Sequence, residues 1–187
     1  MAKPGEIVHV VLTYEDYCRF PNDGRRDEIL EGELAVTPAP APNHQRVSGN
    51  LFRVLADHVS SRGLGEVFIA PIDVILARTS VVQPDLVFVR AERLSLVSNR
   101  GIEGPPDLVV EVLSPTTEAQ DRGAKLQLYA RHGAPHYWLV DPETRRLEAY
   151  ELAGTGYRLV ADLTGSAMFA SALFPGLAVP LDALWPR

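Results

Sequence analysis

The run at residues 108–113, LVVEVL, is the most apolar strand-like segment of the chain, and it contains one carboxylate, Glu111. Such a run predicts a strand of the central sheet, ended by Ser114 and Pro115. An unpaired carboxylate among aliphatic side chains is costly, or it takes up a proton. A divalent cation with hard oxygen ligands is one good compensation. The alternatives are an edge strand with Glu111 facing water and a structural pair with an arginine.

The remaining patterns alternate between helix and strand. Helices are expected over residues 13–20 and 117–132, which open with the capping-box forms Thr13-x-x-Asp16 and Thr117-x-x-Gln120, and over 44–62, capped by Asn43. Strands are expected over residues 27–36 (a hairpin), 65–70, 72–78, 81–89, 136–141 and 145–151. Together they predict a mixed α/β (α+β) domain around one central sheet.

Composition bounds the size and class of the protein. The 187 residues are 46% hydrophobic and 22% charged, which fits one globular domain over residues 1–187 with a core at 12–152. Residues 153–187 are expected to pack on this core, since prolines and Asp182 interrupt their apolar run and exclude a membrane span. The lone Cys18 and the absence of a signal-peptide pattern favour the cytoplasm.

The net charge of −6 argues against a general nucleic-acid coat protein, because such proteins meet phosphates with lysine and arginine. It leaves a nuclease open, since a metal site needs carboxylates and the basic residues can be local.

Asp85 is the second candidate acid, and it follows Pro84 at a strand entrance or bulge. Alternation along a strand places Asp85 and Val87 on one face, and it places Val109 and Glu111 on one face of the apolar strand. If the two strands are neighbours, Asp85 and Glu111 converge and can chelate one metal ion. A lone aspartate at this position is otherwise a turn residue.

Lys125 stands out because lysine is rare in this chain. Among 18 basic residues, only Lys3 and Lys125 are lysine, so the chain otherwise uses arginine for positive charge. A lysine presents a compact ammonium that a planar guanidinium does not replace. A functional Lys125 on the helix after Glu111 and a chance lysine on a solvated helix face are both open.

The three residues together have the layout of PD-(D/E)xK nucleases: Pro-Asp, an acid inside an apolar strand, then a lysine. The chain resembles a bacterial family of restriction-endonuclease-like proteins, the Uma-two family, over roughly residues 12–152. The resemblance rests on the segments YEDYCRF, DEILEGEL, PAPNHQRVSGNL, VVQPDLVFV, PPDLVVEVLSPTT and DRGAKLQLYARHGAPHYWLVDPETRRLEAY. The run VVEVLSPTT, with Lys-x-x-x-Tyr and HYWLVDP behind it, is specific to that family.

This resemblance implies a restriction-endonuclease-like fold, a central mixed sheet flanked by helices with N-terminal and C-terminal hairpin additions. It implies Asp85 and Glu111 as ligands of Mg²⁺ or Mn²⁺, with Lys125 beside them. One departure from the general nuclease motif is that its lysine position, two residues after the acid, is Leu113 here. The resemblance implies that Lys125 has taken over this role from the helix.

Four further positions follow from the family pattern. Glu28 matches an acidic position that joins the catalytic residues, with Glu33 as a competitor and a solvated hairpin charge as the alternative for both. His44 and Tyr129 belong to the substrate-binding part of the site. His44 either contacts substrate phosphate or caps a helix, and Tyr129, one turn after Lys125, is a packing residue that orients the lysine.

The expected function is metal-dependent endonucleolytic hydrolysis of DNA by a homodimer. Two alternatives remain: a catalytically silent nucleic-acid-binding or interaction module with the same fold, and a phosphodiesterase acting on small nucleotides.

Overall fold

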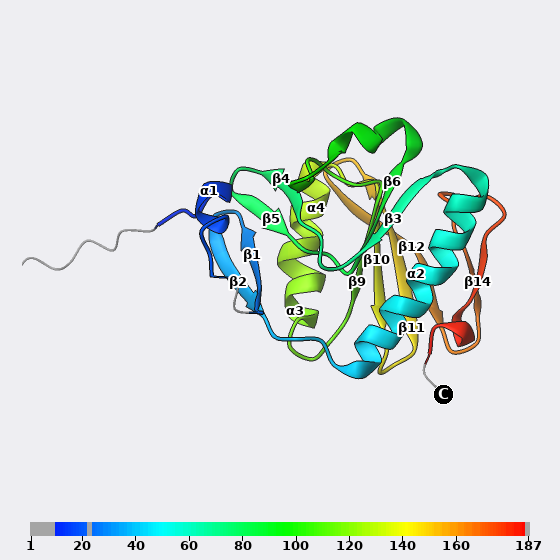
Figure 1. Cartoon of the computed structure of the whole chain (residues 1–187). Coiled ribbons are helices and arrows are strands. Elements are labelled where there is room, and N and C mark those ends of the chain that lie inside the picture. The colour runs from blue at the N-terminus through cyan, green and yellow to red at the C-terminus, as the bar shows by residue number, and fades with distance from the viewer. Residues whose placement is uncertain (1–9, 22–23, 186–187) are drawn as a thin grey trace, which may run out of the picture.

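The computed structural model describes residues 10–21 and 24–185, and their strands form three sheets (Figure 1). The large sheet has the order β12 (Gly156–Thr164), β11 (Arg146–Ala153), β10 (His136–Asp141), β9 (Leu108–Val112), β6 (Leu86–Arg90), β3 (Gly65–Ile69). The second has the order β2 (Glu33–Thr37), β1 (Arg26–Leu30), β5 (Ser80–Val82), β4 (Val74–Ala77), β8 (Gly101–Ile102), β7 (Val97–Ser98). The third pairs β13 (Met168–Ala170) with β14 (Ala178–Pro180).

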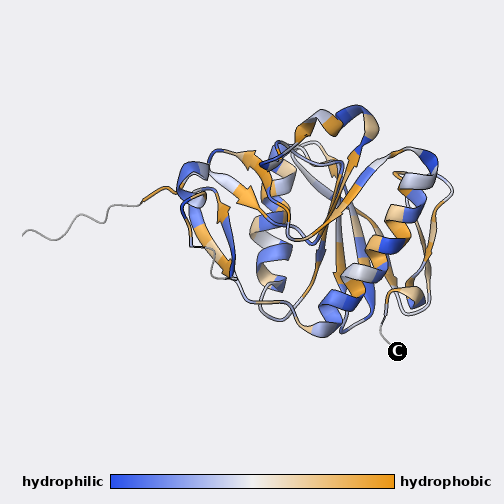
Figure 2. Ribbon diagram, in the orientation of Figure 1, coloured by the Kyte–Doolittle hydropathy of each residue, from blue (hydrophilic) through white to orange (hydrophobic). Residues whose placement is uncertain are grey.

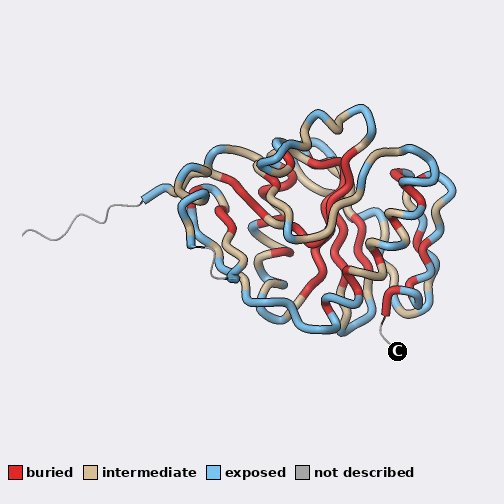
Figure 3. The backbone as a smooth tube through the Cα atoms, viewed as in Figure 1, coloured by how far each residue is buried: buried red, intermediate tan, exposed pale blue. Residues whose placement is uncertain are grey.

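Strand β9 is a central strand, as its apolar sequence predicts. It runs parallel to β10 and antiparallel to β6, and all five of its residues are buried. The hydrophobic colouring of the central strands in Figure 2 coincides with the buried backbone in Figure 3. The alternative of an edge strand with Glu111 facing water is therefore wrong.

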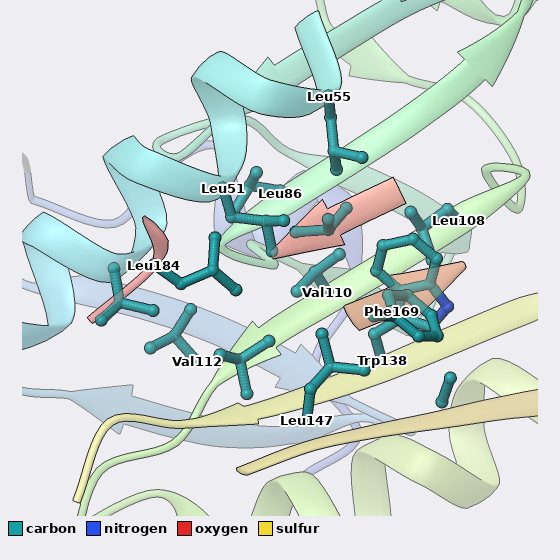
Figure 4. Packing of buried hydrophobic residues seen from close by; sticks show 14 of the residues in the cluster. Leu51, Leu55, Leu86, Leu108, Val110, Val112, Trp138, Leu147, Phe169 and Leu184 are labelled. Carbon is teal, nitrogen blue, oxygen red and sulfur yellow. The ribbon is translucent and has the colours of Figure 1, made fainter. Parts of the chain in front are cut away.

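The large sheet is covered on both faces. Helix α2 (Pro42–Arg62) packs on one face, where its Leu51 and Leu55 belong to the same buried cluster as Val110 of β9 (Figure 4). The other face carries a second helix, built from α3 (Glu118–Gln120), η2 (Asp121–Lys125) and α4 (Leu126–His132), together with strands of the second sheet. Because side chains alternate along a strand, Val110 and Val112 face α2. Val109 and Glu111 then face the second helix.

The expected central sheet is two sheets, and Pro84 is where they separate. The run 81–89 was expected to be one strand, but β5 ends at Val82 in the second sheet and β6 begins at Leu86 in the large one. Proline cannot donate to a sheet ladder, which ends the pairing at this point. Asp85 therefore lies where the chain passes from one sheet to the other.

The helix ends differ from expectation at two places. Thr13 caps the short helix α1 (Tyr14–Tyr17) through the predicted box with Asp16. Thr117 makes no side-chain cap hydrogen bond to the second helix, so that predicted capping box is wrong. Asn43 is not the cap of α2 either, because Pro42 takes the first helical position, which needs no N–H donor, and Ala41 precedes it.

The C-terminal residues complete the core on the α2 face. Phe169, Phe174, Leu184 and Trp185 are buried, and the Phe169 and Phe174 rings contact Trp138 of β10. The helix η3 (Leu181–Ala183) closes this segment. The apolar side chains of this segment are packed inside their own chain. No helix in the described part of the chain is long and apolar enough to cross a membrane.

Candidate active site

A cavity of about 260 Å³ opens where the two sheets and both helices meet. Asp85, Glu111 and Lys125 line it, together with His44 from the first turn of α2. These residues come from four different elements, so only the folded chain brings them together.

Asp85 and Glu111 converge as predicted, because their strands are neighbours. Strands β6 and β9 are antiparallel, with Leu86, the residue after Asp85, opposite Val110, the residue before Glu111. The backbone N–H of Val112 donates to Oδ2 of Asp85 at 2.8 Å. This bond holds the Asp85 carboxylate at the end of β9, within the site.

Lys125 is 4% exposed, so the alternative of a solvated helix face is wrong. Its Nζ lies 3.0 Å from Oε2 of Glu28, 3.2 Å from Oε1 of Glu111 and 3.6 Å from Oδ1 of Asp121. Asp121 and Lys125 are the ends of η2, a single π-helical turn within the second helix. Such wide turns are frequent at functional sites.

Glu28 and not its competitor Glu33 reaches the site. Glu28 is completely buried on β1, and its Oε1 accepts a hydrogen bond from the backbone N–H of Gln83 at 2.7 Å. Neither acid lines the cavity; Glu28 takes part only through its ion pair with Lys125, and Glu33 is exposed on β2. The register pairs Glu28 with Ala35 and Leu30 with Glu33, so both acids point to the same face of the hairpin. Glu33 stands next to the turn and stays exposed, whereas Glu28 in mid-strand is covered.

Two cationic or proton-donating side chains hold Asp85. Arg26 Nη1 lies 3.0 Å from Oδ1, and His44 Nε2 lies 3.1 Å from Oδ2. Because a carboxylate only accepts hydrogen bonds, His44 Nε2 carries a proton in this contact. His44 does not cap α2, and its buried ring is held over Asp85 with its Nδ1 3.4 Å from Ser48 Oγ.

Tyr129 has a different role from the expected one. Its side chain is fully buried and does not line the cavity, so it is closed to substrate. The hydroxyl donates to Oε1 of Glu111 at 3.1 Å. Tyr129 therefore orients the carboxylate, while Lys125 is held by its three acidic partners.

Asp121 and Arg26 are site residues that the sequence reasoning missed. Asp121 is 2% exposed, lines the cavity, and has an Oδ1 atom without a hydrogen-bond partner. Its spacing of four residues before Lys125 on a predicted helix was the available signal. Arg26 had no comparable signal, because it stands beside Arg25 in a charged segment, RRDE.

Comparison with known proteins decides the family. The sequence profile of Uma2, described as a putative restriction endonuclease, matches residues 14–182. The chain belongs to the Uma2 family. It is 25% identical over 158 residues to the uncharacterized protein sll1609 of Synechocystis sp. (strain ATCC 27184 / PCC 6803 / Kazusa), covering 83% of this chain and 89% of that protein. With the uncharacterized protein slr1290 of the same organism the identity is 28% over 157 residues, covering 83% and 82%.

A solved structure shares the fold. The crystal structure of a putative nuclease belonging to DUF820 from Anabaena variabilis ATCC 29413 superposes with a TM-score of 0.78 at 17% identity. The match covers 92% of this chain and 97% of that one. The restriction-endonuclease-like fold expected from the sequence is thereby confirmed.

The surroundings of this Uma2 site shift the pKa values of its acids in opposite directions. Burial raises the pKa of Glu111 well above its usual value, although Lys125 opposes the rise, and burial also raises the pKa of Asp121. Burial disfavours ionised Asp85 too, but the hydrogen bond from His44 and the charge of Arg26 outweigh it and lower its pKa. For Lys125, the nearby acids outweigh burial and raise the pKa, so it stays charged.

The donor set fits one divalent cation. Four buried carboxyl groups, of Glu28, Asp85, Glu111 and Asp121, surround the cations of Lys125 and Arg26, so two negative charges remain when all four are ionised. Among the described residues, no three His, Cys, Asp or Glu side chains already stand in a metal-binding geometry. Acceptor capacity remains, however, since Asp121 Oδ1 makes no hydrogen bond beside its 3.6 Å ion pair with Lys125, and the bonds that Glu111 accepts from Lys125 and Tyr129 both go to Oε1. Hard oxygen donors of this kind suit Mg²⁺ and Mn²⁺.

Proposed function

We propose that this protein is a Mg²⁺- or Mn²⁺-dependent endonuclease that hydrolyses phosphodiester bonds in DNA. Membership of the Uma2 family supports nuclease function in general. The observation that carries the specific proposal is the grouping of Asp85, Glu111 and Lys125 around one cavity, each of them at most 4% exposed. Ion pairs with a purely structural role would not need a cavity beside them.

The residues divide the chemistry among them. Asp85 and Glu111 would hold the cation, which when bound supplies Lewis acidity toward a phosphate oxygen. Lys125 remains an ammonium because three carboxylates surround it, so it stabilises negative charge and does not accept a proton. Glu28 and Asp121 hold the Lys125 side chain in place, and Tyr129 does the same for Glu111.

The start of α2 supports binding of the phosphate group. Ala41 and His44 line the cavity, the helix has no side-chain cap, and its first turn has no acidic residue. The N–H groups of a helix start, with the positive end of its dipole, favour an anion. Residues 42–53 contain no acid and carry the exposed arginines Arg46 and Arg53, which provides local positive charge in a chain of net charge −6.

A homodimer and a cytoplasmic location complete the proposal. Two active sites related by a twofold axis allow both strands of a duplex to be cut. The interface would lie outside the buried C-terminal tail. The single cysteine, Cys18, is exposed and unpaired, which suits a reducing compartment.

The test is cleavage of supercoiled plasmid with Mg²⁺ or Mn²⁺ by the purified protein and by Glu111→Gln. We expect nicked and linear products from the wild type, none from the variant, and none with EDTA. Competition by mononucleotides at micromolar concentration would instead favour a small-nucleotide phosphodiesterase. Binding of DNA without any cleavage would favour the silent module.

A further inference from the structure

A second cavity, of about 360 Å³, adjoins the first, and the function proposed above gives it no role. The two cavities share four wall residues, Arg26, Pro40, His44 and Asp85. Asp85 and His44 thus form a partition with the carboxylates and Lys125 on one side and the second cavity on the other. A group bound in the second cavity would lie directly next to a group bound at Asp85.

The chemistry of the second cavity differs from that of the first. Apart from Arg25, the residues that line only this cavity are uncharged. Gln45, Ser48 and Gln83 contribute polar groups, and Ile69 and Pro71 contribute apolar walls. The charged Arg26 and Asp85 stand only in the shared wall, where they are paired with each other, so the remaining lining offers hydrogen-bonding groups and apolar surface to a partly apolar ligand.

One wall of this cavity is rigid before any ligand binds. The Nε2 atom of Gln83 donates to Tyr17 Oη and to Asp73 Oδ1, both at 2.8 Å, and its backbone N–H donates to Glu28. Since Glu28 also holds Lys125, the Gln83 wall and the catalytic lysine are fixed relative to each other. A ligand group against this wall would be positioned relative to the reacting phosphate.

We infer that the second cavity binds the nucleoside adjacent to the scissile phosphate, with its base removed from the stack. This inference rests on the proposed function, which places the phosphate at Asp85. A volume of 360 Å³ corresponds to about a dozen water molecules, enough for one nucleoside but not for a stacked base pair. Enzymes that bind a base in a closed pocket must extrude it from the duplex or act on a single strand. The protein therefore prefers single-stranded or locally unpaired DNA at the cut.

The first experiment maps cleavage of a fluorescein-labelled single-stranded oligothymidylate in Mn²⁺, with one abasic residue placed within it. We expect cleavage at the bond on one side of the abasic residue to fall about tenfold or more, while the bond on its other side is cut normally. Equal cleavage on both sides would overturn the inference. A second comparison uses the same sequence as a continuous duplex, which we expect to be cut more slowly than the single strand.

The second experiment fills the cavity from the protein side with Gln45→Trp. Gln45 is exposed on α2 and lines the second cavity only, so the indole enters a cavity that Glu111 and Lys125 do not line. We expect weaker oligonucleotide binding and loss of the one-sided abasic effect.

Gln127→Trp, also an exposed helical glutamine but outside both cavities, is the matched control and should behave as wild type. Retention of the abasic effect in folded Gln45→Trp would refute the assignment.

A binding measurement separates failure of this inference from failure of the proposed function. Fluorescence anisotropy in EDTA compares the intact and the abasic oligonucleotide without any cleavage. If the wild type cuts no DNA but binds the intact strand about tenfold more tightly, the nuclease proposal fails and the base-binding cavity stands. If it cuts DNA but shows no base preference in either assay, the cavity assignment fails and the nuclease proposal stands.

Discussion

The Nζ atom of Lys125 lies 3.0 Å from Oε2 of Glu28, so one buried ion pair joins the helix on the large sheet to the first strand of the second sheet. Both side chains are almost completely closed to water. Removal of one partner of a buried pair leaves an uncompensated charge and costs about 3–5 kcal/mol. This contact therefore ties the proposed catalytic role of Lys125 to the stability of the fold.

Lys125→Arg is expected to lower DNA cleavage by a factor of about 10² to 10³. The planar guanidinium does not reproduce three contacts made by a compact ammonium. Because the site is buried, the larger side chain should also destabilise the fold by about 1–3 kcal/mol. Plasmid cleavage and urea denaturation followed by circular dichroism measure the two effects.

Arg131→Lys is the control for that variant, since Arg131 is exposed on α4 outside the cavity. It should leave both cleavage and stability unchanged. Full activity in a folded Lys125→Arg protein would remove Lys125 from the catalytic group.

Glu111→Gln is expected to abolish Mn²⁺ binding in isothermal titration calorimetry. The change removes one charged ligand at nearly constant volume, so the core around β9 remains filled. Glu143→Gln, at an exposed turn, should bind Mn²⁺ as the wild type does. Equal affinity in Glu111→Gln would show that the cation is held elsewhere.

The metal-free protein should lose stability as the pH rises above about 4, the usual pKa range of carboxyl groups. Burial raises the pKa values of Glu111 and Asp121, so the folded state keeps protons that the unfolded chain has released. Their stabilising contribution is complete below the unfolded pKa and is lost as the pH passes through the folded pKa. The contribution of Asp85 to stability has the opposite sign. Because its pKa is lowered in the folded state, it stabilises the fold above the usual pKa of an aspartate, and this contribution is lost only in acid.

Thermal unfolding in EDTA, measured from about pH 5 to about pH 8.5, tests the sign of this pH dependence. The melting temperature of the wild type should fall toward alkaline pH, and that of Glu111→Gln should fall much less. Added Mn²⁺ should stabilise the wild type more at pH 8 than at about pH 5, because cation and protons compete for the same oxygens. A melting temperature that rises steadily with pH in EDTA would contradict the assignment.

Tyr129→Phe is expected to weaken Mn²⁺ binding by about 10- to 100-fold, as loss of a group that orients a metal ligand commonly does. The variant removes only the hydroxyl that donates to Glu111. The free energy of unfolding should fall by about 0.5–1.5 kcal/mol. Tyr150→Phe is a matched control, since the Tyr150 hydroxyl makes no hydrogen bond within residues 10–21 and 24–185 and Tyr150 does not line the cavity. Unchanged metal affinity in Tyr129→Phe would assign Tyr129 to packing alone.

Multi-angle light scattering at micromolar concentration should report twice the chain mass of 20.5 kDa if the proposed homodimer forms. Leu184→Ala should lower stability by about 2–5 kcal/mol through a core cavity, because Leu184 is buried within its own chain. Its effect should not depend on protein concentration. A monomer at all concentrations would rule out the dimer and leave each site to act on one strand.

The local chemistry of the chain was sufficient for several elements of the site. A carboxylate inside LVVEVL, a Pro-Asp step and an isolated lysine in an arginine-using chain each departed from what their surroundings favour. Those departures, with the family resemblance, indicated Asp85, Glu111, Lys125 and Glu28. The helix capped by Thr13 and the hairpin at Glu31-Gly32 were also predictable, since turns and caps depend on neighbouring residues.

Tertiary structure alone decided the features that depend on distant partners. Glu28 and Glu33 lie on the same face of the hairpin, and only the tertiary partners of Glu28, the Gln83 backbone and Lys125, distinguish the two acids. Arg26 and His44 meet Asp85 only because two sheets separate at Pro84, and Tyr129 reaches Glu111 instead of Lys125 across a helix–strand contact. Sequence patterns record the preferences of each segment, whereas the partner of a buried charge is chosen by the packing of segments far apart in the chain.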